Sequence, residues 1–159
     1  MEIPRRQLDL RDDPGVLSPP ILTQPLYGCA KAVNITGYVP DATLDVEING
    51  AIVVAGFPGG SPSPSGAIIQ LPSPLTPGQQ VRVRQHRGAA TSAWSPAPAA
   101  IVRDHTADYP AGLPRPELFQ TPLYKCGVRT GVGNLLVGCD IRIEADAVTV
   151  GSVAGANNP

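Results

Sequence analysis

A basic cluster and a lone tryptophan are the residues of this sequence whose types suggest ligand binding. His86 and Arg87 end the run VRVRQHR, and Trp94 follows shortly after them. Cationic side chains attract anions, and an exposed indole stacks on a sugar ring. With the glycine-rich segment 56–66, these side chains form a candidate anion- or polysaccharide-binding site. Trp94 has a second interpretation, in which its ring packs against the last strand and closes the end of the fold.

The basic cluster also has a structural interpretation. Arg82 and Arg84 alternate with valines, and Asp45 and Glu47 alternate with apolar residues in an earlier strand-like run. If the two runs are neighbouring strands, each arginine faces an acid across the sheet, and each such pair contributes roughly 0.2–1 kcal/mol. We therefore expect a salt-bridged ladder here rather than a free basic patch.

The three cysteines, Cys29, Cys126 and Cys139, lack the CxxC spacing or neighbouring histidine that would complete a metal site. We expect Cys29 and Cys126 to be small buried apolar residues. The alternative is an intermolecular or inter-repeat disulfide. A Cys126–Cys139 bond is disfavoured, because most of a strand separates the two residues and a disulfide needs Cα atoms within about 7 Å.

Other reactive groups are few. Asp104, His105 and Asp108 supply fewer than the six or more oxygens that Ca²⁺ prefers, so we expect a solvated linker there. The sequence has two histidines, no convincing Ser-His-Asp arrangement and no phosphate-binding glycine loop. These features predict a protein that is not an enzyme and that uses no cofactor or metal.

Composition excludes several classes of protein. Of the 159 residues 42% are hydrophobic, which is enough for a packed core, whereas 17 glycines and 19 prolines disfavour long helices. A net charge of −1 argues against nucleic-acid binding. No stretch approaches the roughly 18 apolar residues of a membrane span, and the first residues lack the apolar region of a signal peptide.

An internal repeat organises the chain. The run PLYGC at 25–29 returns as PLYKC at 122–126, 97 residues further along, and apolar positions keep this offset over about 35 residues. A period near 100 residues is the size of a small β-sandwich. Counterparts of most of residues 59–102 would fall beyond Pro159. Two interpretations stay open: the sequence is a fragment of a longer tandem array, or another chain completes the second copy.

Alternating apolar and polar residues predict strands. The run LDVEING at 44–50 ends in Asn49-Gly50, the strongest short hairpin signal, so residues 51–55 should turn back beside it. Residues 56–66 are expected to form a flexible loop. Further strands are predicted near 21–26, 30–39, 67–71, 81–84 and 99–102. The total is about seven strands, and no run requires a helix.

Three runs carry a resemblance to known families. ITGYVPDATLDVEING (35–50) looks like the B–C strands of bacterial immunoglobulin-like repeats. LTPGQQVRVRQ (75–85) and TSAWSP (91–96) resemble the F–G region of fibronectin type III-like modules. The resemblance implies an all-β fold, an antiparallel Ig-like or FnIII-like β-sandwich with one full repeat and a partial second copy. The expected divisions are an N-terminal extension (1–16), the sandwich (17–103), a linker (104–113) and the partial repeat (114–159).

The resemblance concerns the fold, and the lack of catalytic groups makes a non-enzymatic structural or interaction module the first hypothesis for the function. We expect a spacer or assembly segment of a larger bacterial surface, secreted or phage-tail-like protein, which favours an extracellular or surface-exposed location. The partners would be other copies of the chain or neighbouring repeats of a larger protein. The alternative is a carbohydrate- or ligand-binding module that takes a glycan at Trp94, His86 and Arg87.

The partial repeat has its own candidate surface. Ile141, Ile143, Val148 and Val150 form a half-covered apolar face with exposed strand edges, which are unfavourable in water. We therefore expect a strand or sheet from another chain to complete this copy by β-augmentation.

Overall fold

The computed structural model describes residues 17–63, 66–119, 130–136 and 138–156. The first unit, residues 17–103, contains β1 (Ile21–Leu22), β2 (Ala32–Thr36), β3 (Thr43–Ile48), β4 (Ala51–Pro58), β5 (Ala67–Gln70), β6 (Gln80–Arg87), β7 (Ala90–Thr91) and β8 (Ser95–Ile101). After it come α1 (His105–Asp108), β9 (Glu117–Leu118), β10 (Val132–Gly133), β11 (Cys139–Ala145) and β12 (Val148–Ala156). The N-terminal extension 1–16 and the repeated run 122–126 lie outside the described residues.

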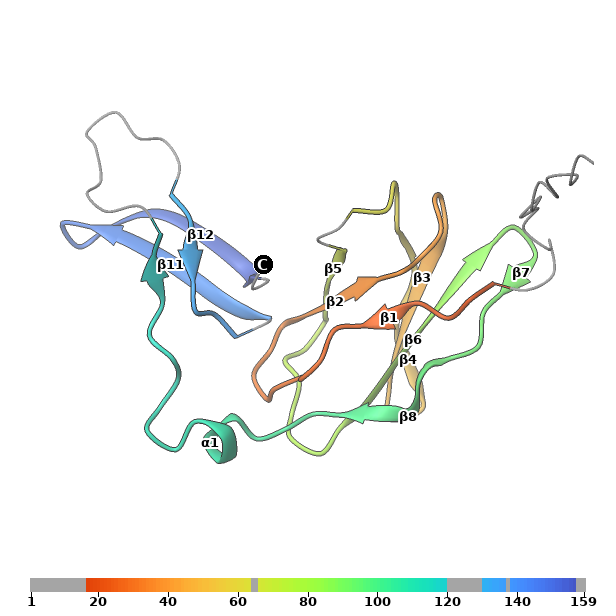
Figure 1. Cartoon of the computed structure of the whole chain (residues 1–159), viewed down its shortest axis with the longest axis horizontal. Helices are drawn as coiled ribbons and strands as arrows, with labels where there is room; N and C mark the ends of the chain where they lie inside the picture. Colours follow the sequence, from red (N-terminus) through yellow and green to blue (C-terminus); the bar gives the residue numbers. More distant parts are fainter. Residues whose placement is uncertain (1–16, 64–65, 120–129, 137, 157–159) are drawn as a thin grey trace, which may run out of the picture.

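Two antiparallel sheets form the first unit (Figure 1). One has the order β1-β2-β5. The other has the order β4-β3-β6, and both β7 and β8 pair with β6. The all-β class expected from the sequence is correct. The unit has eight strands rather than seven, because the short β7 folds back on the end of β6 around Gly88, which has a φ of +58°.

The hairpin predicted at Asn49-Gly50 joins β3 to β4. Both turn residues have positive φ, 51° and 83°, as a two-residue turn that matches the strand twist requires. The expected loop at 56–66 is wrong at its start: β4 continues to Pro58, because Phe57 and Pro58 still lie opposite the first residues of β3.

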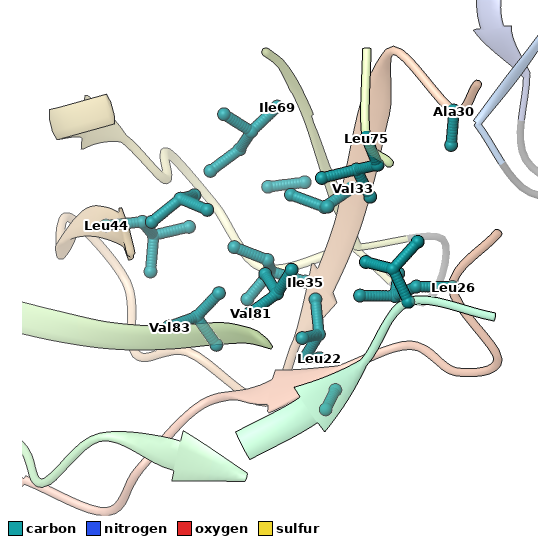
Figure 2. Packing of buried hydrophobic residues seen from close by; sticks show 14 of the residues in the cluster. Leu22, Leu26, Ala30, Val33, Ile35, Leu44, Ile69, Leu75, Val81 and Val83 are labelled. Atoms are coloured by element: carbon teal, nitrogen blue, oxygen red, sulfur yellow. The ribbon is translucent and has the colours of Figure 1, made fainter. Parts of the chain in front are cut away.

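The core of the first unit lies between its two sheets (Figure 2). Val33 and Ile35 of β2 and Ile69 of β5 face Leu44, Val46, Val81 and Val83 of β3 and β6, and all seven side chains are fully buried. The core residues of each of these strands lie at every second position, since successive side chains point to opposite faces of a sheet. The strands predicted at 30–39, 44–50 and 81–84 are confirmed.

A buried amide continues the inward row of β6. Gln85 is completely inaccessible; its Oε1 accepts the Val39 N–H at 2.8 Å, and its Nε2 donates to the Ser18 carbonyl at 2.6 Å. The Gln85 N–H donates to the Ser92 hydroxyl at 3.0 Å. One side chain therefore joins β6 to two loops that precede β1 and β3.

The segment expected to be a solvated linker contains α1 and is held to the first unit. Asp104 caps this turn by accepting the Thr106 N–H. The Tyr27 hydroxyl donates to Asp108 Oδ2 at 2.8 Å, and Arg103 pairs with the other oxygen of Asp108. The Tyr27 ring meets that of Tyr109 edge to face, with centroids 5.9 Å apart. The expectation of a solvated linker is therefore wrong for Asp108, which these contacts largely enclose.

The hairpin β11–β12 reproduces the register of β3–β4 at the offset of 97 residues. Ala145 lies opposite Val148 as Ile48 lies opposite Ala51, and Glu144 lies opposite Thr149 as Glu47 lies opposite Ile52. Both hairpins then have a bulge at the same place, which skips Val150 in one and Val53 in the other. The turn Asp146-Ala147 also has positive φ at both residues.

The C-terminal segment, the described part of residues 114–156, lacks a comparable core. Within it Leu136 is the one hydrophobic side chain that is buried. Its strands form two separate two-stranded sheets, β9–β10 and β11–β12. Several large apolar side chains of this segment are exposed: Leu118, Phe119, Val148, Val150 and Val153. The exposed Leu113 lies just before the segment. The two hairpins thus share a register while differing in burial.

We predict that Gln85→Met destabilises the first unit by about 2 kcal/mol, because the variant keeps the volume but leaves buried backbone donors and acceptors unpaired. Urea denaturation followed by circular dichroism measures this change. Gln80→Met is the matched control on the same strand, where the side chain is exposed, and should change stability by less than about 0.5 kcal/mol. Equal effects of the two substitutions would contradict the assigned role.

Candidate functional site

A ladder of opposite charges covers the outer face of the larger sheet. Asp45 lies directly opposite Arg84, and Glu47 directly opposite Arg82. Each arginine Nε donates to the facing carboxylate at 2.9 Å. The two carboxylates are nearly buried, whereas the guanidinium groups are partly exposed. The predicted cross-strand salt bridges are confirmed.

Trp94 completes this face. Its ring centroid lies 4.4 Å from the Arg84 guanidinium carbon and 5.6 Å from that of Arg82. A guanidinium beside an indole is attracted by the negative face of the ring. Trp94 is half-buried, and the contacts of its ring are with guanidinium groups of β6, so the role considered for it in closing the end of the fold stays a prediction. The ring already contacts cationic groups of its own chain.

The other two candidate ligand-binding residues lie near the end of β6. His86 Nε2 is 2.7 Å from Asp45 Oδ2, and its Nδ1 is 2.9 Å from the Thr91 hydroxyl. Arg87 is exposed at the start of the β6–β7 turn. The structure therefore brings His86 and Trp94 to the same charged face, on either side of Arg84, and leaves Arg87 at its rim.

Asp45 is the centre of this network. Its Oδ1 accepts the Gly56 N–H at 2.9 Å, and its Oδ2 accepts from Arg84 and lies beside His86. Burial alone would raise the pKa of Asp45, but the hydrogen bonds from Gly56, His86 and Arg84 outweigh burial and lower that pKa below its usual value. Sequence reasoning missed Gly56, which we assigned to a flexible loop; its φ of +65° turns this N–H toward the carboxylate.

An open cavity of about 540 Å³ lies in the C-terminal segment, between β9–β10 and β11. Leu118, Leu136, Ile141 and Ile143 are among the residues that line it. In the first unit the corresponding space between β1–β2 and β3–β4 is filled by side chains of β5, β6 and β8. The cavity therefore marks the place where such strands would pack.

The four candidate strand-pairing residues do not all lie on one face of the hairpin: three share a face, and the fourth lies in the bulge. Ile141, Ile143 and Val148 share one face by register, and the two isoleucines are half-buried, whereas Val148 is exposed. Val150 is the extra residue of the bulge and is 63% exposed. The sequence pattern did not reveal this bulge.

The cysteines differ from the expectation. Cys29 is exposed in a turn with a φ of +70°, so the prediction of a buried apolar role is wrong for it. Cys139 is half-buried and begins β11 rather than lying in a turn. The pKa of the Cys139 thiol is raised above its usual value. Burial is the largest cause, and the nearby Asp140 and Cys29 side chains add to it. Cys126 lies outside the described residues.

The described residues form neither a metal-binding cluster nor a membrane-spanning helix. No group of three or more histidine, cysteine, aspartate or glutamate side chains in this part of the chain could hold a metal ion. No helix among the same residues is long and apolar enough to cross a membrane.

We predict that Asp45→Asn lowers the free energy of unfolding by about 2 kcal/mol at pH 7, because Arg84 loses its buried counter-charge. The lowered pKa of Asp45 means that its contribution is present above the pKa of the unfolded chain and is lost as the pH falls through the folded-state pKa. Urea denaturation from pH 7 to pH 3 should therefore show a flatter acid dependence for the variant. Asp41→Asn, at an exposed turn, is the control and should keep the wild-type slope. An unchanged slope in Asp45→Asn would contradict this assignment.

Comparison of the chain with protein-family models, with curated proteins and with solved structures finds no match. The charged face, the open cavity and the edge of the β11–β12 hairpin are therefore the features of the molecule that bear on its function.

Proposed function

We propose that this chain is a non-enzymatic structural module of tandem Ig-like or FnIII-like β-sandwich type, which assembles by strand pairing with a second copy of itself. It would serve as a spacer or assembly segment of a larger surface-exposed or secreted protein. The observation that carries the proposal is the edge of β11, which has no strand partner among the described residues.

The strand order of the first unit supports the family assignment. A three-stranded sheet β1-β2-β5 faces a sheet β4-β3-β6-β8, and all pairings between these strands are antiparallel. This order agrees with the two-sheet arrangement of Ig-like domains. The equivalent register of β3–β4 and β11–β12 supports the assignment of residues 114–159 as a partial second copy.

The edge of β11 is the natural pairing site. In the first unit β3 lies between β4 and β6, and six consecutive residues pair with β6. Its counterpart β11 pairs with β12 alone in the part of the chain that is described. Unpaired N–H and C=O groups along such an edge form a template for another strand. The hairpin also extends away from the first unit, which leaves room for a partner (Figure 1).

The charges on β11 favour a second copy as that partner. Arg142 and Glu144 alternate with Ile141 and Ile143, and within one chain they form an ion pair with each other. In an antiparallel pairing of two β11 strands centred on Ile143, Arg142 of each copy faces Glu144 of the other. The two copies would then reproduce the acid–base pairing that Asp45 and Glu47 make with β6. A two-fold arrangement of this kind is closed and self-complementary.

The same pairing helps to cover the apolar face. Two β11 strands side by side would join two hairpins into one four-stranded sheet, with both sets of isoleucines on the same side. The cavity beneath each hairpin would then open toward its symmetry mate instead of water. The proposal accounts for the exposed Val148 and Val153, which would extend this shared face.

We predict a concentration-dependent dimer whose interface depends on these charges. Arg142→Glu should weaken dimerisation about tenfold or more, because it places like charges opposite each other twice in the symmetric interface. The double variant Arg142→Glu/Glu144→Arg should restore it. Size exclusion with light scattering from about 1 µM to 1 mM, with reductant present, measures the dissociation constant.

Arg87→Glu is the control for this experiment, because it makes the same change in net charge on the first unit. It should leave dimerisation unchanged. A monomer at every concentration would overturn strand pairing between copies. A dimer that Arg142→Glu leaves unweakened would place the interface elsewhere and overturn the role of this edge.

A carbohydrate-binding module is the second candidate, supported by the half-buried Trp94 on the charged outer face. Under the structural proposal, Trp94 emission should not respond to a panel of neutral and acidic glycans, because Arg82 and Arg84 already contact the ring. A saturable change that disappears in His86→Ala or Arg87→Ala would establish the ligand-binding alternative instead.

A further inference from the structure

We propose that Cys29 and Cys139 are the sites of a disulfide that joins the first unit to the C-terminal hairpin, formed by thiol–disulfide exchange with a small-molecule disulfide. This inference does not depend on strand pairing between copies. It rests on the contact between residues 29–32 and 138–140.

The backbones of the two segments touch at this contact. The Lys31 N–H donates to the Gly138 carbonyl at 3.0 Å. Gly138 packs so closely on the first unit that a Cβ atom added to it would lie 2.7 Å from Ala30 Cβ and 2.7 Å from the Ala32 carbonyl oxygen. Gly138 also has a φ of +85°, so both its space and its conformation require glycine.

An ion pair holds the same two segments. Lys31 Nζ lies 2.6 Å from Asp140 Oδ2, and this interaction raises the pKa of the lysine. Cys29 precedes Ala30, and Cys139 follows Gly138, so each cysteine is the chain neighbour of a residue in the contact. Consecutive Cα atoms are about 3.8 Å apart, and disulfide-bonded cysteines have Cα atoms about 4.4–6.8 Å apart. The contact therefore places the two cysteines on segments that touch each other, one residue away from the point of contact.

The two thiols differ in a way that suits sequential exchange. Cys29 is exposed and accessible to a soluble disulfide, whereas Cys139 is half-buried. The proximity of the Cys29 thiol is one cause of the raised pKa of Cys139, after burial and Asp140. Disulfide formation by exchange requires two thiols with different roles. One must be accessible to the oxidant, and the other, which can be sheltered, must attack the mixed disulfide.

The disulfide forms in two thiol–disulfide exchange steps. The Cys29 thiolate attacks a disulfide RSSR, such as oxidised glutathione, which forms Cys29–S–S–R and releases one RS⁻. The Cys139 thiolate then attacks Cys29 Sγ, which forms the Cys29–Cys139 bond and releases the second RS⁻. The two cysteines lose two electrons to RSSR, and their two protons go to the two RSH products.

The expected consequence is a redox-dependent junction. In the reduced chain, the hairpin is held to the first unit by Lys31, Asp140 and the Gly138 contact. In the oxidised chain, a covalent bond would fix the same arrangement and limit hinge motion between the two units. A spacer would then be stiffer in an oxidising compartment than in a reducing one.

The test uses the full chain with Cys126→Ser, which leaves Cys29 and Cys139 as the two cysteines. The native protein is incubated with oxidised glutathione, and free thiols, intact mass and non-reduced peptides are measured. We expect both thiols to disappear with the loss of two hydrogen atoms and with a Cys29–Cys139 cross-linked peptide. The same peptide should dominate in the wild type, which guards against a folding defect of Cys126→Ser.

Controls separate a preformed contact from random oxidation. Cys29→Ser and Cys139→Ser should each abolish the cross-link, and Cys139→Ser should leave the exposed Cys29 glutathionylated. Oxidation in 8 M urea should give about tenfold less of this cross-link relative to mixed disulfides, because the loop must then close by chance. Two separately glutathionylated cysteines in the native protein, or a bond only between chains, would overturn the proposal.

Discussion

The pairing of β3 with β6 is the interaction on which the first unit depends, since it organises both faces of the larger sheet. Over six residues in register, the inward positions bring Leu44 and Val46 against Val81 and Val83 in the core. The outward positions bring two acids opposite two arginines, and Trp94 covers the guanidinium groups. A slip of one residue would bury the charges and expose the valines, so the register is strongly specified.

The C-terminal segment shows which features of the fold are set by neighbouring residues and which require residues from distant parts of the chain. The β11–β12 hairpin keeps the register, the bulge and the positive-φ turn of β3–β4, because these features are set by a few neighbouring residues. Burial is different. In the first unit β5, β6 and β8 fill the space between the sheets, whereas the C-terminal segment has an open cavity there. A hairpin therefore forms the same way in both places, but a core requires strands from further away.

The two parts of the chain are joined by contacts as well as by sequence. Tyr27 and Arg103 hold Asp108 at α1, and Lys31 holds Asp140 at the start of β11. The close approach of Gly138 to Ala30 adds a steric fit that a larger residue would destroy. These contacts all come from the turn between β1 and β2 or from the end of β8, so one end of the first unit forms the junction. Such a junction suits a module whose role is to hold its neighbours in a defined arrangement.

The sequence by itself determined most strands of the first unit, the Asn49-Gly50 hairpin and the charge ladder, because alternation and turn residues act over a few positions. It also indicated the repeat and the apolar residues of β11 and β12. Only the tertiary structure decided the environment of single side chains. Gln85 is buried because it meets Ser18, 67 residues earlier, and Tyr27 meets Asp108 across 81 residues. Cys29 is exposed for the same reason: a side chain's burial depends on which distant segments pack beside it, and period-two patterns carry no information about that choice.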